Sequence, residues 1–325
     1  MNNYSRLQQL LHQFALSSKL MREIAFDVEN TFLNESHYSD NHVFVSGLAR
    51  SGTTILLNAL FESGEFSSLS YKDMPFVLAP NFWSRFSSKR KDHNFIERAH
   101  GDGIKISTES PEAFEEVFWR TFSDKSNNSK KKFQDYVQLI NQKYSKTRYL
   151  SKNNQNIRRL ELISQIFPCS KILIPFRDPV QHSISLLSQH IKFINESKED
   201  IFINKYMKWI GHTEFGPSYQ PIKDCALIYD NYFDINHWLE QWLRTYEDCL
   251  VKFSNKQNFI FICYESLCND SSIWPSILNK VGIEEIYEFN FIESSKKTIT
   301  GADKDLEFKC NEIYQSLHRH SLLTA

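Results

Sequence analysis

The chain has 325 residues, of which 41% are hydrophobic and 24% are charged, and its formal net charge is −1. This composition is ordinary for a globular protein, and the length is sufficient to bury a substantial core. A nearly neutral chain has no overall attraction to nucleic acid or anionic lipid, so both are excluded as general partners.

Six cysteines are present, and none forms a CxxC pair or a His/Cys cluster at zinc spacing. We therefore expect free thiols in a reducing compartment and no metal site. The N-terminal sequence MNNYSRLQQLLHQF lacks the apolar segment of a signal peptide. No run approaches the roughly 18 apolar residues of a membrane span. These features predict a soluble, cytoplasmic protein.

The chain begins with amphipathic sequence. Within residues 5–32, apolar side chains recur at near-helical spacing, at Leu7, Leu10, Leu11, Phe14, Ile24, Ala25 and Val28. This predicts one or two helices, in an N-terminal helical region of residues 1–40, that pack on the sheet. The apolar run 43–45 predicts the first strand, and residues 53–61 predict the helix after it.

Residues 64–110 are rich in serine, proline, aromatic and charged residues without a sustained period, and we expect an irregular, acceptor-facing insert there. Ser110, followed by proline and acidic residues, predicts a helix that begins at this serine. The segment 127–132, NNSKKK, is predicted to be a solvated linker. Periodicity predicts five further elements: helices over 156–167, 180–194 and 238–253, and buried strands over 171–176 and 259–263.

Strands that alternate with helices, without internal repeats, predict an α/β fold. We expect a P-loop-type parallel sheet with helices on both faces. One domain over residues 1–325 is expected, rather than two.

The stretch VFVSGLARSGTTILLNAL, residues 43–60, has the order strand, small-residue loop and helix that is typical of a P-loop. Gly47, Gly52 and Thr54 meet the pattern G-x-x-x-x-G-K-[ST], whereas Thr53 stands in place of the lysine. Such a loop binds phosphate through backbone N–H groups and a helix N-terminus. The nearest cation is Arg50. This arrangement favours a 5′-phosphate that carries one more oxyanionic group over the terminal phosphates of a nucleoside triphosphate.

The segment RSGTT, beginning at Arg50, resembles the 5′-phosphosulfate loop of sulfotransferases that use 3′-phosphoadenosine-5′-phosphosulfate (PAPS). Arg177, followed by Ser185 and preceded by the strand KILIPF, resembles the family's 3′-phosphate motif. The segments FICYESL and SKNNQNIRRLELISQIFP resemble two weaker family features, particularly in the bacterial and tyrosylprotein branches. The resemblance covers about residues 43–267. It implies the sulfotransferase fold and transfer of a sulfuryl group from PAPS to an acceptor hydroxyl without a metal.

The resemblance also implies roles for individual residues. Those expected to bind the cosubstrate are Arg50, Ser51, Gly52, Thr53, Thr54, Lys152, Arg177, Ser185, Lys296 and Lys297. Arg50 is further expected to stabilise charge on the leaving group, because it would lie beside the bond that breaks.

The acceptor hydroxyl needs a general base, and the sequence offers three candidates. Asp73 follows the first helix of the fold, where tyrosylprotein and some bacterial sulfotransferases carry a carboxylate. His100 lies in RAHGDGI, whose glycines permit a tight turn, and other sulfotransferases use a histidine. Glu116, beside Glu115 on the helix predicted after Ser110, is the third.

Two other functions fit parts of the sequence. A P-loop kinase or nucleotidase would need the missing lysine and a magnesium-binding acid after a strand, and neither is apparent. A catalytically silent binding protein would not need to keep Arg50, Thr53, Arg177 and Ser185 together. The acceptor is expected to be a carbohydrate or glycoconjugate hydroxyl, with a tyrosine or a small molecule as the alternative. The oligomeric state is not predicted.

Overall fold

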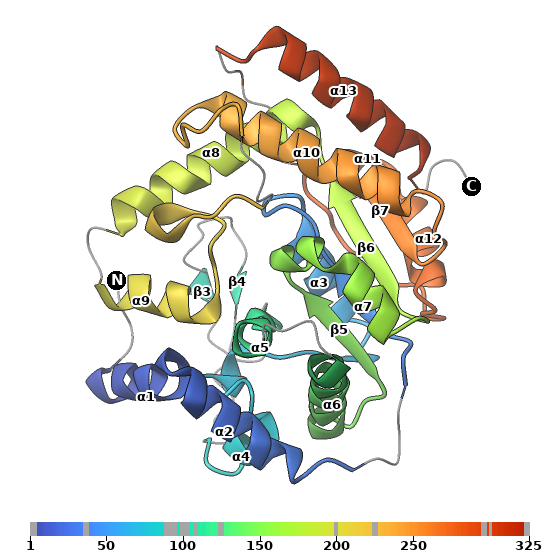
Figure 1. Cartoon of the computed structure of the whole chain (residues 1–325). Helices are drawn as coiled ribbons and strands as arrows, with labels where there is room; N and C mark the ends of the chain where they lie inside the picture. The colour runs from blue at the N-terminus through green and yellow to red at the C-terminus, as the bar shows by residue number, and fades with distance from the viewer. Residues whose placement is uncertain are drawn as a thin grey trace.

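The computed structural model describes residues 5–34, 39–87, 96–97, 105–106, 110–112, 114–122, 127–197, 201–222, 227–293, 298 and 301–321. At its centre lies a five-stranded sheet in the order β2-β5-β1-β6-β7 (Figure 1). All four neighbouring pairs in this sheet are parallel. The strands are β1 Val43–Val45, β2 Phe66–Ser67, β5 Arg148–Lys152, β6 Lys171–Phe176 and β7 Phe259–Cys263.

A separate antiparallel pair is formed by β3 Ile96–Glu97 and β4 Lys105–Ile106. The α-helices are α1 Arg6–Ser17, α2 Lys19–Asn30, α3 Thr53–Phe61, α4 Pro80–Ser84, α5 Glu116–Thr121, α6 Asn127–Tyr144, α7 Leu160–Ile166, α8 Pro179–Glu196, α9 Ile201–Ile210, α10 Ile235–Phe253, α11 Tyr264–Asn269, α12 Ile273–Lys280 and α13 Lys304–Arg319. Short 3-10 turns are η1 Tyr71–Asp73, η2 Asn154–Arg158 and η3 Gly216–Ser218.

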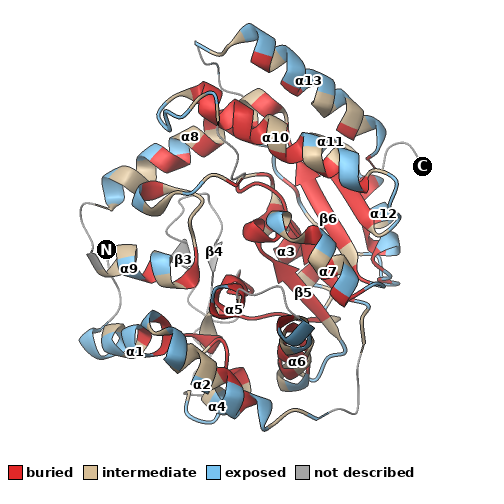
Figure 2. Ribbon diagram, in the orientation of Figure 1, coloured by how far each residue is buried: buried red, intermediate tan, exposed pale blue. Residues whose placement is uncertain are grey.

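The sheet separates two hydrophobic clusters, because successive side chains of a strand point to opposite faces. Val43 and Val45 pack in one cluster with α3, α11 and α12. Phe44, between them, packs in the other with α6, α7, α8, α10 and α13. Figure 2 shows the strands buried and the outer helices buried on one side only. The predicted α/β fold, with helices on both faces of a parallel sheet, is confirmed, as are the predicted strands.

Two sequence predictions near the middle of the chain are wrong. The predicted helix does not begin at Ser110, because Pro111 pairs with Ser70 in an isolated antiparallel bridge and α5 begins only at Glu116. The segment 127–132 is no linker, because it forms the first turns of α6. There Phe133 enters the core directly after the lysines, so tertiary packing outweighs the polar local sequence.

The two N-terminal helices form as predicted, but they do not use the predicted faces. Leu7, Leu10 and Phe14 of α1 are 77%, 64% and 55% exposed, whereas Ala15 and Leu16 are buried. The helices pack against other helices, α1 on α9 and α2 on α4, α5 and α6. The periodicity therefore identified the helices but not the neighbours that cover them (Figure 2).

Candidate active site

Polar segments follow three adjacent strands at the carboxyl edge of the sheet. The loop 46–52, here called the β1–α3 loop, leaves β1, Asn154 follows β5, and Arg177 follows β6. Val45 is in register with Lys152, the last residue of β5, and with Leu173 of β6, which continues to Phe176, so the three parallel strands end at the same edge of the sheet. Ligands of open parallel sheets bind at this edge.

The β1–α3 loop has a conformation that requires its glycines. Gly52 is the N-cap of α3 with φ 98°, and a Cβ there would lie 2.4 Å from Cδ2 of Tyr264. A Cβ on Gly47 would lie 2.9 Å from the carbonyl oxygen of Pro175. Arg50 itself has φ 68°, which is uncommon for a residue with a side chain. The loop thus lies tightly against β6 and α11.

The two arginines of the sequence motifs lie in the same site. Nη1 of Arg177 donates to the carbonyl oxygen of Arg50 at 3.1 Å, and Nε of Arg50 donates to Oγ of Ser185 at 3.2 Å. The hydroxyl of Thr53 donates to Oδ1 of Asn154 at 3.1 Å, which joins the β1–α3 loop to the end of β5. Residues 135 positions apart, Arg50 and Ser185, are therefore brought into contact.

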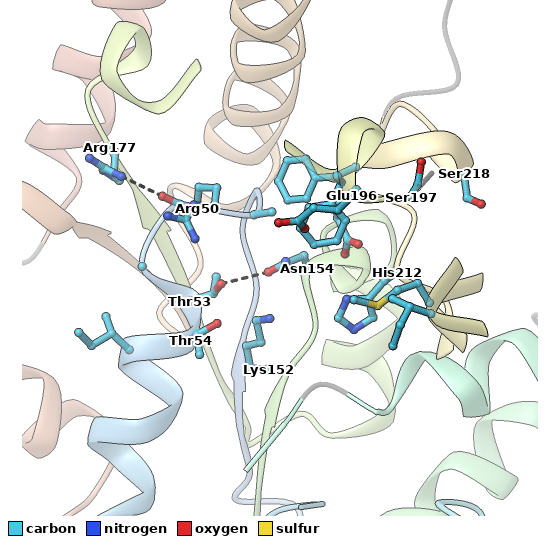
Figure 3. A pocket seen from close by; sticks show the side chains of 18 of the residues that line it. Arg50, Thr53, Thr54, Lys152, Asn154, Arg177, Glu196, Ser197, His212 and Ser218 are labelled. Carbon is cyan, nitrogen blue, oxygen red and sulfur yellow. Dashed lines mark hydrogen bonds between the residues drawn. The ribbon is translucent and has the colours of Figure 1, made fainter. Parts of the chain in front are cut away.

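A cavity of about 460 Å³ opens beside these residues. Its sheet side is lined by Ala49, Arg50, Gly52, Thr53, Thr54, Ile55, Lys152, Asn154, Arg177, Tyr264, Ile292 and Glu293. Its helix side, formed by α8, α9 and the segment after α9, is lined by Phe193, Glu196, Ser197, Ile203, Asn204, Met207, His212, Glu214, Phe215, Pro217 and Ser218. Figure 3 shows the two sets facing each other, with Asn154 between them.

Arg177 is held by the segment after β7. Its Nε lies 3.7 Å from Oε1 of Glu265, and its guanidinium lies over the ring of Tyr264, 5.7 Å from the centroid. The same Glu265 oxygen accepts from the backbone N–H of Asp178 at 3.0 Å, while the Asp178 side chain caps α8. The tyrosine and glutamate of the FICYESL segment therefore orient the arginine.

Lys152 lies beside a buried carboxylate. Its Nζ is 4.0 Å from Oε1 of Glu112, and the two side chains are only 5% and 4% exposed. The hydroxyl of Tyr71 donates to the other Glu112 oxygen at 2.8 Å. The bridge between Ser70 and Pro111 places Glu112 there, where the sequence predicted a helix.

His182 supports the loop from beneath. Burial, followed by the charge of Arg177, lowers the pKa of His182 to about 3. The neutral imidazole donates from Nε2 to the carbonyl oxygen of Ala49 at 2.7 Å.

Two of the candidate bases lie outside the cavity lining. Asp73 is fully buried, accepts from the Ser70 N–H at 2.7 Å and the Tyr144 hydroxyl at 2.6 Å, and pairs with Lys143. Its contacts are those of a structural carboxylate.

Glu116 pairs with Arg159 through both oxygens, at 2.6 and 3.1 Å, and accepts from Asn153 at 2.8 Å. Its neighbour Glu115 is buried and accepts from Trp119, Tyr149, Ser151 and Asn156. The third candidate, His100, and the proposed phosphate contacts Lys296 and Lys297 lie outside the described residues.

The helix side of the cavity contains residues that the sequence analysis missed, chiefly His212 and Glu214. They lie in the segment GHTEFG, between Gly211 and Gly216, which have φ 82° and 75°. Glycines on both sides of a short polar segment were the signal that singled out His100, and the same signal occurs here.

The described part of the chain holds no group of three His, Cys, Asp or Glu side chains placed to bind a metal ion. None of the described helices combines the length and apolar composition needed to cross a bilayer.

Comparison with known proteins gave a family match and similarities to several solved structures. No curated protein sequence matches the chain. The structure is similar to sulfotransferase STF1 from Mycobacterium tuberculosis H37Rv, with a TM-score of 0.47 and 12% identity over 98% of this chain and 82% of that one. Sulfotransferase STF9 from Mycobacterium avium gives a TM-score of 0.43 and 12% identity over 96% and 78% of the two chains.

A sulfotransferase from Alicyclobacillus acidocaldarius gives a TM-score of 0.38 and 13% identity over 86% of this chain and 93% of that one. A sequence profile described as "Sulfotransferase family" matches residues 42–284, which is more than half of the chain and includes Arg50, Lys152 and Arg177. The chain therefore belongs to the sulfotransferase family.

Proposed function

We propose that this protein transfers a sulfuryl group from PAPS to the hydroxyl of a carbohydrate or glycoconjugate. The observation that carries the proposal is the meeting of Arg50, Lys152 and Arg177, from three strand ends, at one cavity. PAPS carries a net charge of about −4, counting about −2 for its 3′-phosphate. Three converging cations and the N-terminus of α3 suit such a ligand.

The residues present fit the two ends of PAPS. Gly52 lets the backbone approach closely, so the N–H groups of the β1–α3 loop, with Thr53 and Thr54, would hold the 5′-phosphosulfate. Arg177 and Ser185 would hold the 3′-phosphate, as the motif resemblance implies. In this structure Arg50 contacts both of them, so we expect its guanidinium to turn toward the anhydride oxygen when PAPS binds.

Sulfuryl transfer depends mainly on positioning and on stabilising charge at the leaving oxygen. In the proposed reaction, the bond from sulfur to the anhydride oxygen breaks and a bond from sulfur to the acceptor oxygen forms. Arg50 and Lys152 would stabilise the negative charge on the departing adenosine 3′,5′-bisphosphate. The acceptor loses its proton to a base.

We propose His212 as this base. His212 lines the cavity, which Asp73 and Glu116 do not, and Figure 3 shows it on the helix side, across from Lys152. Imidazole changes charge near neutral pH, which suits it to accept a hydroxyl proton. Asp73 forms a buried ion pair with Lys143, and Glu116 forms a partly buried ion pair with Arg159.

Arg177→Ala should weaken binding of adenosine 3′,5′-bisphosphate, measured by titration calorimetry, by at least about 10-fold. Arg50→Ala should lower kcat about 10²- to 10³-fold. Arg319→Ala, which removes an exposed arginine of α13, is the matched control and should change neither. Turnover that requires ATP and Mg²⁺ and is absent with PAPS would overturn the proposal in favour of a kinase.

His212→Gln should lower kcat by about 10²-fold or more and flatten the acidic limb of its pH profile. Binding of the bisphosphate should be unchanged. A wild-type pH profile in this variant would exclude His212 as the base.

A further inference from the structure

The helix side of the cavity points to the charge of the acceptor. We infer, on the basis of the proposed sulfuryl transfer, that the acceptor is an amino sugar whose protonated amine is bound by Glu214. The sequence analysis left the acceptor as a carbohydrate, a tyrosine or a small molecule.

Glu214 is held in place by a constrained segment. A Cβ on Gly211 would lie 2.5 Å from Cγ of Glu116, and one on Gly216 would lie 3.2 Å from Cβ of Phe193, so the segment packs closely on α5 and α8. Between these glycines, Thr213 accepts from the Gln220 N–H at 2.9 Å and its hydroxyl accepts from Gln155 at 3.2 Å. Glu214 therefore has a fixed backbone on the cavity wall.

The charge of Glu214 has no partner within the described protein. It is half-buried and forms no ion pair with any described residue. Glu196, the other glutamate of the helix side, lies 3.7 Å from Lys192 and its side chain is 52% exposed, so solvent and the lysine screen its charge. The helix-side lining among the described residues contains no lysine or arginine.

Bound PAPS would add further negative charge next to the acceptor. Its charge of about −4 exceeds that of the three cations that the described residues place on the sheet side, so the cosubstrate and these residues together would present negative charge to the acceptor, opposite Glu214. A neutral acceptor would leave Glu214 unpaired, and an acidic one would add repulsion. An ammonium group on the acceptor would be attracted by Glu214 and by the donor, which favours a cationic substrate over its neutral and anionic analogues.

The remaining helix-side residues suit a sugar ring. Phe193 and Phe215 lie 6.0 Å apart between ring centroids at an interplanar angle of 48° and, with Ile203 and Met207, form an apolar wall. Such a surface accepts the C–H face of a pyranose, while Ser197 and Ser218 can bond to its hydroxyls. Figure 3 shows these two serines and His212 on this side.

Three methyl glycosides of different charge test the inference: a glucosaminide with a free amine, its neutral N-acetyl derivative and a glucuronide, which has a hydroxyl at C2 and a carboxylate at C6. With PAPS in excess, kcat/KM should be at least about 10-fold higher for the amine than for the N-acetyl compound, and lowest for the glucuronide. Ten-fold corresponds to about 1.4 kcal/mol. Binding of each glycoside to the enzyme saturated with adenosine 3′,5′-bisphosphate should follow the same order.

Glu214→Gln should bring the amine to N-acetyl ratio to about 1 without changing affinity for the bisphosphate, whereas the control Glu196→Gln should keep most of the preference. Equal kcat/KM for amine and N-acetyl compounds, or a preference that survives in Glu214→Gln, would overturn the inference. So would sulfation of other acceptors with no binding of the glucosaminide. Binding of adenosine 3′,5′-bisphosphate separates this inference from the proposed function. If the enzyme binds the bisphosphate, these outcomes contradict only the inference about the acceptor, and if it does not, the proposed function itself is contradicted.

Discussion

Replacing Glu112 by glutamine should lower the stability of the ligand-free enzyme. The same replacement should raise its affinity for adenosine 3′,5′-bisphosphate, the product formed from the cosubstrate. The carboxylate lies 4.0 Å from Nζ of Lys152, and both side chains are almost fully buried. Glutamine keeps an oxygen that can accept the hydrogen bond from Tyr71 and removes only the negative charge.

The size of both effects follows from this pair. At an effective dielectric constant of about 20, two charges 4 Å apart attract by about 4 kcal/mol, which is an upper limit for the lost interaction. Removing one partner of a buried pair typically costs about 3–5 kcal/mol, because the other charge remains buried. We therefore expect Glu112→Gln to lower the free energy of unfolding of the empty enzyme by about 2–4 kcal/mol. An anion bound beside Lys152 replaces the lost carboxylate, so the bound form should lose less.

By linkage, the affinity for adenosine 3′,5′-bisphosphate must rise by the difference between these two losses. A difference of about 1–2 kcal/mol gives roughly 5- to 30-fold tighter binding. Thermal unfolding with and without the bisphosphate, together with titration calorimetry, measures both quantities. Glu247→Gln, at an exposed position of α10, is the control and should change neither. Unchanged or weaker binding in Glu112→Gln would refute the idea that Lys152 faces the anion site.

Three further predictions concern Gly52 of the β1–α3 loop, the buried Asp73 and His182. Gly52→Ala should weaken bisphosphate binding about 10-fold or more and lower Tm, because its Cβ would displace Tyr264 and adds about 1–2 kcal/mol of left-handed strain. Gly64→Ala is the control, because it carries the same strain at φ 69° but has open space around it, so it should lower Tm without affecting bisphosphate binding. Equal losses of binding in both variants would contradict the clash between the Cβ added in Gly52→Ala and Tyr264. Asp73→Asn breaks a buried ion pair and should lower the free energy of unfolding by about 3–5 kcal/mol, while kcat per folded molecule stays within about two-fold of wild type. A loss of kcat above about 100-fold at normal Tm would make Asp73 the base. The pKa of His182 falls from 6.5 to about 3 on folding, so the unfolded chain binds more protons between these values and stability should decrease as pH falls through this window. Chemical denaturation from pH 7 to pH 4 should show that the free energy of unfolding falls less steeply with pH in His182→Gln than in the wild type. An unchanged dependence on pH would contradict the lowered pKa of His182.

The convergence of the cations could be predicted because it depends on topology alone. Parallel strands end at one edge, so residues directly after two adjacent strands must be neighbours whatever their separation in sequence. Arg50 and Arg177 follow β1 and β6, which are paired, and the cavity contains both. Lys152 ends β5 on the other side of β1, but the sequence analysis did not predict this strand, and Lys152 was expected at the site only from the family resemblance.

The position of Glu112 could not be predicted, because a local signal pointed to a different structure. Serine, proline and acidic residues in SPEAFEE are typical of a helix start. In the folded chain Pro111 instead pairs with Ser70, which brings Glu112 to Lys152 from 40 residues away along the sequence. Propensity describes a segment alone, whereas this contact depends on the position of Ser70, which follows β2 where that strand pairs with β5.

The same distinction explains why spacing along the chain did not place the side chain of Asp73 at the cavity. Asp73 follows the β1–α3 unit at nearly the expected separation, yet a separation fixes the length of chain and not the direction of a side chain. In η1 the Asp73 carboxylate turns back to cap Ser70 and is held by Tyr144 of α6, so it faces the core. His212 reaches the cavity through α9, whose position depends on α1 and α5, and only the packing of these helices brings an imidazole opposite Lys152. The base proposed here is thus positioned by the helical layer, whereas the residues proposed to hold the cosubstrate are positioned by the strand ends.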